Sequence, residues 1–238
     1  MTRMNTIAPM LSALALATSL SACTNFITGP TTTEERRVSG YSFVEVASGF
    51  DVEIRLDTTE GVTIEAPEEA MKHIETIVSG DRLHIGLDNV FNGSFSPRRA
   101  IVRVRSLRGV AASGGTEIEG VGTFTAPDFS LEASGGSRVT LSVTAGRTGM
   151  SASGGSEITL RGSSDNLAIE SFSGGGRFHG FDYATSVTTL EASGGSRLDV
   201  RAAARLDVDA SGGSAIYYRG HPTITSDLSG GSKIVDAN

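Results

Sequence analysis

The sequence predicts an all-β protein, a parallel β-helix or β-solenoid with about 18–21 residues per coil. Two observations predict this fold. Every second residue is apolar or small in segments such as Phe129 to Val143, and a period of two is typical of strands with one buried face. The triplet Ser-Gly-Gly also recurs seven times at nearly constant spacing, which indicates a stack of equivalent units. The copies begin at Ser113, Ser134, Ser153, Ser173, Ser193, Ser211 and Ser229.

A single coil of short strands cannot bury its apolar side, so successive coils are expected to stack about 4.8 Å apart. An antiparallel meander is the alternative, but it requires hairpin turns such as Asn-Gly and does not require the same triplet in every repeat. Stacked glycines allow a positive φ or a tight corner without steric cost. If the pleat persists through the triplet, Gly135 and Ser137 face inward, whereas Ser134 and Gly136 face outward.

Two further columns of residues follow from this stacking. The residues just after the triplets are expected to form a hydroxyl ladder inside the corner, with each group bonded to a neighbour or to a carbonyl: Thr116, Ser137, Ser156, Ser196, Ser214 and Ser232. The next position faces outward and alternates in charge over its first four members, which supports the register of the coils. This outward row consists of Glu117, Arg138, Glu157, Arg177, Arg197, Ala215 and Lys233.

The part of the chain before the triplets, residues 38–110, is expected to be β-rich and to cap the Ser-Gly-Gly solenoid of residues 111–238. Residues 67–74 favour one or two helical turns, because Pro67 stands first and acidic residues follow. Residues 47–52 and 78–83 look like degenerate triplets, so wider and less regular coils are predicted here. The last coil leaves an open edge, through which a homo-oligomer contact is possible.

The first 37 residues predict export and anchoring. Residues 1–22 have the basic start and the apolar stretch of a signal peptide, and that stretch is too short for a comfortable membrane span. Leu20-Ser21-Ala22-Cys23 resembles a bacterial lipobox, so Cys23, the one cysteine of the chain, is the expected lipid anchor. Residues 23–37 are predicted to be the lipidated cysteine and a tether. Because Thr24, and not Asp, follows the anchor, the outer membrane is the expected location.

The lipobox, the segment Gly49-Phe50-Asp51-Val52-Glu53-Ile54 and the repeated triplets together resemble the head GIN domain family. Its members are described as auto-transporter adhesin-like proteins of bacterial envelopes, formerly a domain of unknown function. The resemblance covers about residues 38–238 and rests mainly on the repeat. It implies a right-handed β-helix on an exported protein. It carries over no catalytic or binding residue, because the shared motif is structural.

The composition and the scattered polar residues indicate no enzyme, cofactor or metal site. A net charge of −7 excludes a basic nucleic-acid interface, and the four histidines show no zinc spacing. Enzymes with a β-helix fold gather carboxylates on one face, for which Asp199, Asp207 and Asp209 are the candidates here. Alternation with apolar neighbours instead predicts that Asp199 and Asp209 face solvent.

The leading functional hypothesis is therefore a non-enzymatic lipoprotein of the cell envelope that acts as a structural or interaction module. A carbohydrate-binding or adhesive protein is the alternative, with His179, Tyr217 and Tyr218 as candidates for its ligand surface. A polysaccharide-active β-helix enzyme is the third hypothesis. The expected partners are the membrane, through Cys23, and an envelope protein or a glycan.

Overall fold

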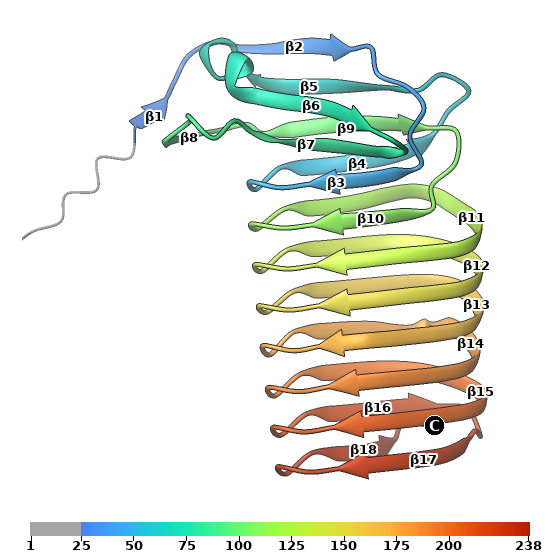
Figure 1. The fold of residues 1–238 in the computed structure, drawn as a ribbon. Helices are drawn as coiled ribbons and strands as arrows, with labels where there is room; N and C mark the ends of the chain where they lie inside the picture. The colour runs from blue at the N-terminus through green and yellow to red at the C-terminus, as the bar shows by residue number, and fades with distance from the viewer. Residues whose placement is uncertain (1–24) are drawn as a thin grey trace, which may run out of the picture.

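Most of the described residues, 25–238, lie in β-strands of the computed structural model (Figure 1). The predicted signal peptide and Cys23 lie outside the described residues. The N-terminal part, called the head below, contains β1 (Asn25–Ile27), β2 (Thr31–Arg36), β3 (Phe43–Val46), β4 (Asp51–Leu56), β5 (Gly61–Pro67), the 3-10 helix η1 (Glu68–His73), β6 (Ile74–Ser79), β7 (Arg82–Leu87), β8 (Gly93–Phe95) and β9 (Arg99–Val104). The stacked part contains β10 (Gly109–Ala112), β11 (Glu117–Ala133), β12 (Arg138–Ala152), β13 (Glu157–Phe172), β14 (Arg177–Ala192), β15 (Arg197–Ala210), β16 (Ala215–Arg219), β17 (Thr223–Leu228) and β18 (Lys233–Asp236).

The stacked part is a right-handed parallel solenoid, which confirms the predicted fold class (Figure 1). Each long strand bends once, so that its first half pairs in one sheet and its second half in another. In β15, for example, Arg197–Arg201 pair with β16, whereas Arg205–Ala210 pair with β17. The rear sheet below means the strands that follow each triplet, and the front sheet means the strands that lead into the next triplet. Alternate side chains of both sheets meet in one continuous core.

The seven glycine pairs lie in vertical columns at the corner between the two sheets, as the stacked account requires. Both glycines of every pair have φ between +59° and +82°. Gly135 is exposed, so the prediction that it faces inward is wrong: the positive φ values interrupt the pleat. Ser137 is buried as predicted. Five of the six ladder hydroxyls donate to backbone carbonyls at the corner, as Ser156 Oγ does to the Ser153 carbonyl at 2.6 Å. The sixth, Ser232 Oγ, accepts a hydrogen bond from the Ser214 N–H at 3.2 Å.

One coil departs from this corner pattern in two compensating positions. Most coils place alanine before the triplet and serine or threonine after it, but here Phe172 and Gly176 occupy these positions. A Cβ atom on Gly176 would lie 2.9 Å from Cε1 of the Phe172 ring. The ring, which is 1% exposed, therefore fills the space that the missing side chain leaves free. Phe172 and Gly176 are therefore coupled, because they share one packing site.

The head continues the stack and then closes it. β7 pairs in parallel with β3, and β9 pairs in parallel with β4, so one more coil extends each sheet. β6, β5 and β2 then add antiparallel strands, and η1 buries Ala70 and Met71. The helical turn predicted for residues 67–74 is confirmed.

Two predictions for this region need correction. Residues 47–52 do form a corner, with Ser48 at φ 69°, but residues 78–83 form the antiparallel hairpin of β6 and β7. The tether predicted for residues 23–37 is wrong for Asn25–Ile27, which form strand β1 against β8, and for Thr31–Arg36, which form strand β2 against β5. The polar sequence TTTEER has no apolar period because β2 is an exposed edge strand, so no buried face marks it in the sequence.

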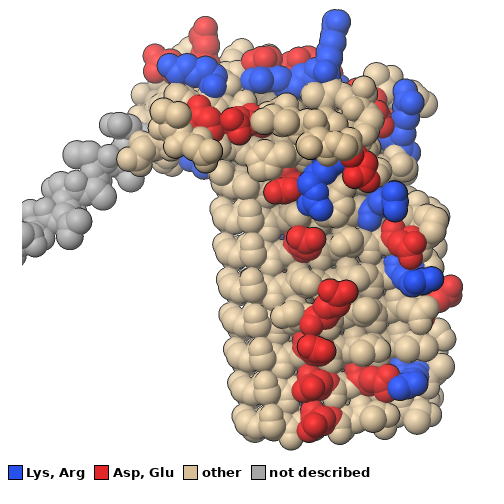
Figure 2. Space-filling view, in the orientation of Figure 1, with Lys and Arg blue, Asp and Glu red and all other residues tan. Residues whose placement is uncertain are grey.

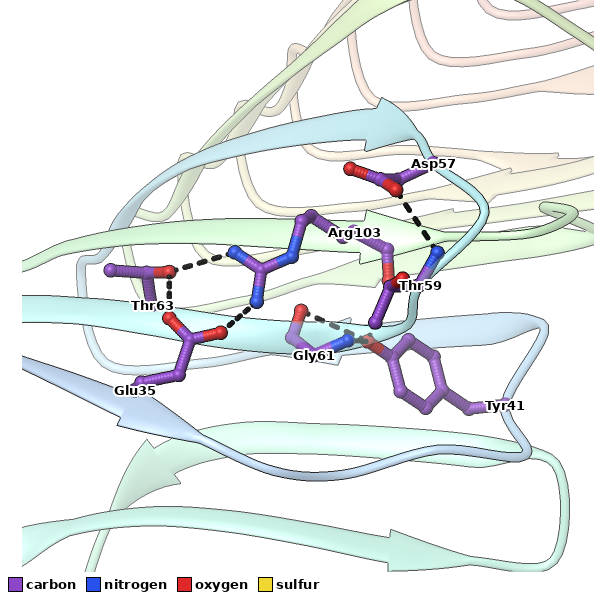
Figure 3. Close-up of polar contacts among 7 residues, drawn as sticks. All are labelled: Glu35, Tyr41, Asp57, Thr59, Gly61, Thr63 and Arg103. Atoms are coloured by element: carbon purple, nitrogen blue, oxygen red, sulfur yellow. Dashed lines mark hydrogen bonds and ion pairs between the residues drawn. The ribbon is translucent and has the colours of Figure 1, made fainter.

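A polar network links the strands of the head (Figure 3). The Arg103 guanidinium contacts Thr63 and Glu35, which joins β9 to β5 and β2. The buried Tyr41 Oη accepts a hydrogen bond from the Gly61 N–H at 3.1 Å and donates to the Arg103 carbonyl at 2.8 Å. Burial raises the pKa of Tyr41 to about 12.

We expect Tyr41→Phe to lower the free energy of unfolding by about 1–3 kcal/mol, because the Gly61 N–H loses its acceptor in a buried position. The raised pKa adds a dependence on pH. The stabilising contribution of Tyr41 is complete below pH 10, the ordinary value, and is lost as the pH rises through about 12. Urea unfolding at neutral and alkaline pH measures both effects. Tyr217→Phe on the solenoid surface is the control, and equal losses in the two variants would contradict the role of Tyr41.

Candidate functional site

The outward row after the corner is in register from coil to coil, as predicted. Glu117, Arg138, Glu157, Arg177 and Arg197 are direct partners on successive strands of the rear sheet. Arg138 Nη2 lies 3.1 Å from Glu157 Oε2, and Arg138 Nη1 lies 3.8 Å from Glu117 Oε2. The hydrogen bond from Arg138 lowers the pKa of Glu157 below its usual value. These exposed pairs support the register and contribute little energy individually.

A second outward row of the rear sheet brings two of the three predicted ligand-surface residues together. His179, Asp199 and Tyr217 occupy the same position on three successive coils. His179 Nε2 lies 3.1 Å from Glu157 Oε1, and its Nδ1 lies 3.7 Å from Asp199 Oδ2. Arg197 completes the cluster: its Nη2 lies 3.0 Å from Asp199 Oδ1, and its guanidinium lies 3.9 Å from the centre of the Tyr217 ring.

Tyr218, the third predicted residue, is not part of this cluster. It occupies the position that pairs with Val200, a buried residue, and it packs against the core. Its Oη donates to Asp236 Oδ2 at 3.2 Å. The alternation along β16 could have predicted this difference. Successive residues of a strand point to opposite faces, and Ile216 points inward, so Tyr217 points outward and Tyr218 points inward.

Asp199 is buried, at 6% exposure, so the prediction that it faces solvent is wrong. The alternation correctly placed it on the outer side of the sheet, but Arg197 and the residues of the neighbouring coils lie against it there. Asp209 is exposed, as predicted. It lies in the front sheet with Asp207, whereas Asp199 lies in the rear sheet. The three carboxylates proposed for a polysaccharide-active site therefore do not share one face.

The front sheet carries a second surface feature, which the spacing of the residues along the chain does not reveal. Figure 2 shows acidic side chains in a line down the coils, and the exposed acids of this sheet include Glu132, Glu170, Glu191, Asp209 and Asp227. Glu191, Asp209 and Asp227 are direct partners on successive coils. Beside the corner lies a groove of about 630 Å³, lined by small residues together with Glu45, Arg82 and Glu132.

The chemistry of these two surfaces suits binding. The rear cluster offers an aromatic ring, a guanidinium, an imidazole and carboxylates within a few ångströms, which is the inventory of a polar ligand surface. Within residues 25–238, no group of three or more His, Cys, Asp or Glu side chains is arranged to hold a metal ion. The same residues include no helix that is both long and apolar enough to cross a membrane.

Comparison with known proteins identifies the relatives of this architecture. The family described as "Putative auto-transporter adhesin, head GIN domain" matches residues 40–222. A crystal structure titled as a putative adhesin from Bacteroides fragilis has a TM-score of 0.80 at 18% identity, over 89% of this chain and 97% of that chain.

Two further crystal structures come from Parabacteroides species. One, from Parabacteroides distasonis, is titled as a putative lipid binding protein, with a TM-score of 0.72 and 16% identity over 90% of this chain and 99% of that one. The other, from Parabacteroides merdae, is titled as a putative adhesin, with a TM-score of 0.72 and 13% identity over the same shares. At such identities the likeness shows the fold. No curated protein sequence matches the chain.

Proposed function

The chain belongs to the family described as "Putative auto-transporter adhesin, head GIN domain", and from this membership we propose a non-enzymatic, lipid-anchored interaction module of the bacterial cell envelope. The family description supports a role at the cell envelope or the cell surface. The rigid stack of coils supports a role in presenting a surface, because every coil is held by parallel backbone pairing to the next.

The position of β1 in the head indicates how this module would be oriented on the membrane. Asn25, only two residues after Cys23, begins β1, which pairs with β8 in the head. Two residues span at most roughly 7 Å, so a lipid at Cys23 would hold the head against the membrane. The last coil lies at the opposite end of the stack from the head (Figure 1). The solenoid would then point away from the bilayer and expose both sheets to a partner.

The anchor is tested by expressing the full chain and Cys23→Ala in a bacterium with an outer membrane, and by measuring palmitate incorporation and membrane fractionation. We expect the parent chain to incorporate palmitate and to fractionate with the outer membrane, and the variant to lose the label. An unlabelled parent chain would overturn the anchor. Incubation with uronate polymers tests the non-enzymatic part of the proposal, and newly formed unsaturated or reducing ends would overturn it.

Carbohydrate binding is the second candidate function, and the cluster of His179, Asp199, Arg197 and Tyr217 favours it. A sugar ring can stack on an aromatic ring at a protein surface, as the half-buried Tyr217 ring is, while charged neighbours bond its hydroxyls. A glycan array with the parent chain, Tyr217→Ala and His179→Ala tests this candidate. We expect binding that both replacements weaken, with Glu191→Gln on the front sheet as the control. Binding that is indifferent to the rear replacements would exclude this surface.

A further inference from the structure

The two ends of the stack differ in how they are closed. At the head, the outermost strand β2 carries Glu34, Glu35 and Arg36, and charged side chains on an edge strand oppose further pairing. The helix η1 also packs over this end with Ala70 and Met71 buried. The other end is formed by β17 and β18, and no helix of the described residues packs over it.

The final coil exposes backbone edges and apolar side chains together. Among residues 25–238, β17 pairs with β15 alone and β18 pairs with β16 alone, so each strand has one free edge. Ile224 and Leu228 continue the inward columns of Leu206 and Ala210, yet they are 38% and 39% exposed. Ile234 continues the column of the fully buried Ile216 and is itself only partly buried. One more layer of strands would cover all three.

Two residues of opposite charge lie on either side of the last Ser-Gly-Gly corner. Asp227 is the last outward residue before this corner, and Lys233 is the first outward residue after it. Both are exposed, and neither forms an ion pair with any residue of the described range 25–238. β17 runs toward the corner, whereas β18 runs away from it.

All of these features fit a pair of chains related by a two-fold axis that runs parallel to the strands, just beyond the final coil. This axis places β18 of a second copy beside β17, and β17 of that copy beside β18, with each pair antiparallel. The inward apolar side chains stay on the inside, where those of the two copies cover one another. Asp227 of each copy then lies opposite Lys233 of the other, so two ion pairs form at the rim.

We propose that a second copy of this chain docks end to end on the final coil in this two-fold arrangement. Asp236, the charged residue on the inner side, is compatible with it because Tyr218 Oη and the Asn238 N–H already bond its carboxylate, at 3.2 and 2.9 Å. The strands that pair are six and four residues long, so the interface is small and the dimer dissociates on dilution. This consequence rests on the proposed lipid anchor: with a head anchored at each end, such a dimer would join two facing membranes.

Sedimentation of the full chain in a density-matched detergent, with micelles in excess over protein, tests the proposal over a concentration series. We expect a monomer–dimer equilibrium that Leu228→Lys abolishes. Asp227→Lys and Lys233→Asp each place like charges opposite one another twice, so each should weaken association by about tenfold or more. The double variant Asp227→Lys/Lys233→Asp restores the opposite charges and should recover the parent affinity to within about threefold. Thermal melts of every variant report whether the coil remains folded.

The charge exchange separates this geometry from other contacts. A head-to-tail contact places Asp227 and Lys233 against the head of the next copy, so the double variant would not recover affinity, and that result would overturn the two-fold arrangement. A parent chain that stays monomeric at every concentration would overturn the dimer itself. Neither result bears on the lipid anchor or on glycan binding, which are measured separately.

Discussion

Gly194→Ala is expected to destabilise the protein far more than Gly195→Ala, although the two glycines are neighbours with similar φ angles of 69° and 78°. Both replacements force an alanine into the left-handed region, at a cost of about 1–2 kcal/mol. A Cβ on Gly194 would also lie 2.9 Å from the Gly174 nitrogen of the preceding coil, whereas a Cβ on Gly195 meets nothing within 4 Å. Overpacking of this kind adds about 1–3 kcal/mol.

Gly194→Val extends the same series. A β-branched side chain at positive φ is a strong outlier, and its methyl groups reach further into the coil above, so cooperative melting should be lost. Differential scanning calorimetry and urea unfolding measure the series, with Asp209→Asn on the exposed front sheet as a control that leaves stability nearly unchanged. Equal losses for Gly194→Ala and Gly195→Ala would contradict the steric role of the first glycine column and leave only backbone strain.

Phe172→Ala is expected to cost about 3–5 kcal/mol, because it empties a fully buried site at the corner of one coil. Gly176→Ser should also destabilise, since the new Cβ would approach both the Phe172 ring and the Ser156 carbonyl oxygen to 2.9 Å, and only the first of these contacts is relieved by Phe172→Ala. The double variant Phe172→Ala/Gly176→Ser recreates the alanine and serine found in the neighbouring coils, as at Ala152 and Ser156. It should be less destabilised than Phe172→Ala alone.

A double-mutant cycle on the free energy of unfolding measures this coupling. We expect the interaction between the two positions to favour the double variant by about 0.5–3 kcal/mol, the range for side chains that share one packing site. Phe178→Ala combined with Gly176→Ser is a matched control, because Phe178 is equally buried but is not the ring that a Cβ on Gly176 would contact. If the losses in unfolding free energy of Phe172→Ala and Gly176→Ser simply add in the double variant, the Phe172 ring does not occupy the space of the missing side chain at position 176.

The regular coils were predictable because each carries its own structural signal. The spacing of the triplets sets the coil length, and the alternation of apolar residues sets which side chains face inward. The outward row from Glu117 to Arg197 was predicted in the observed register for the same reason. At the head, Pro67 and the acidic residues after it marked the helical turn of residues 67–74.

The head and the candidate site were harder to predict because their order depends on segments distant in sequence. β2 has no apolar period of its own and is placed by pairing with β5. Residues 78–83 contain a glycine like that of a triplet, but antiparallel pairing turns them into a hairpin. The burial of Asp199 depends on Arg197, His179 and Tyr217, and these four residues come from three successive coils.

The sequence by itself determined a parallel stack with a fixed coil length, a glycine corner and the inward or outward side of most residues. It could do so because backbone pairing repeats the same local geometry in every coil. Only the tertiary structure decided how the head closes one end, which outward side chains meet across coils, and that Ile224 and Leu228 stay exposed at the other end. Those features depend on which segments lie against one another, and contacts between distant segments leave no period in the chain.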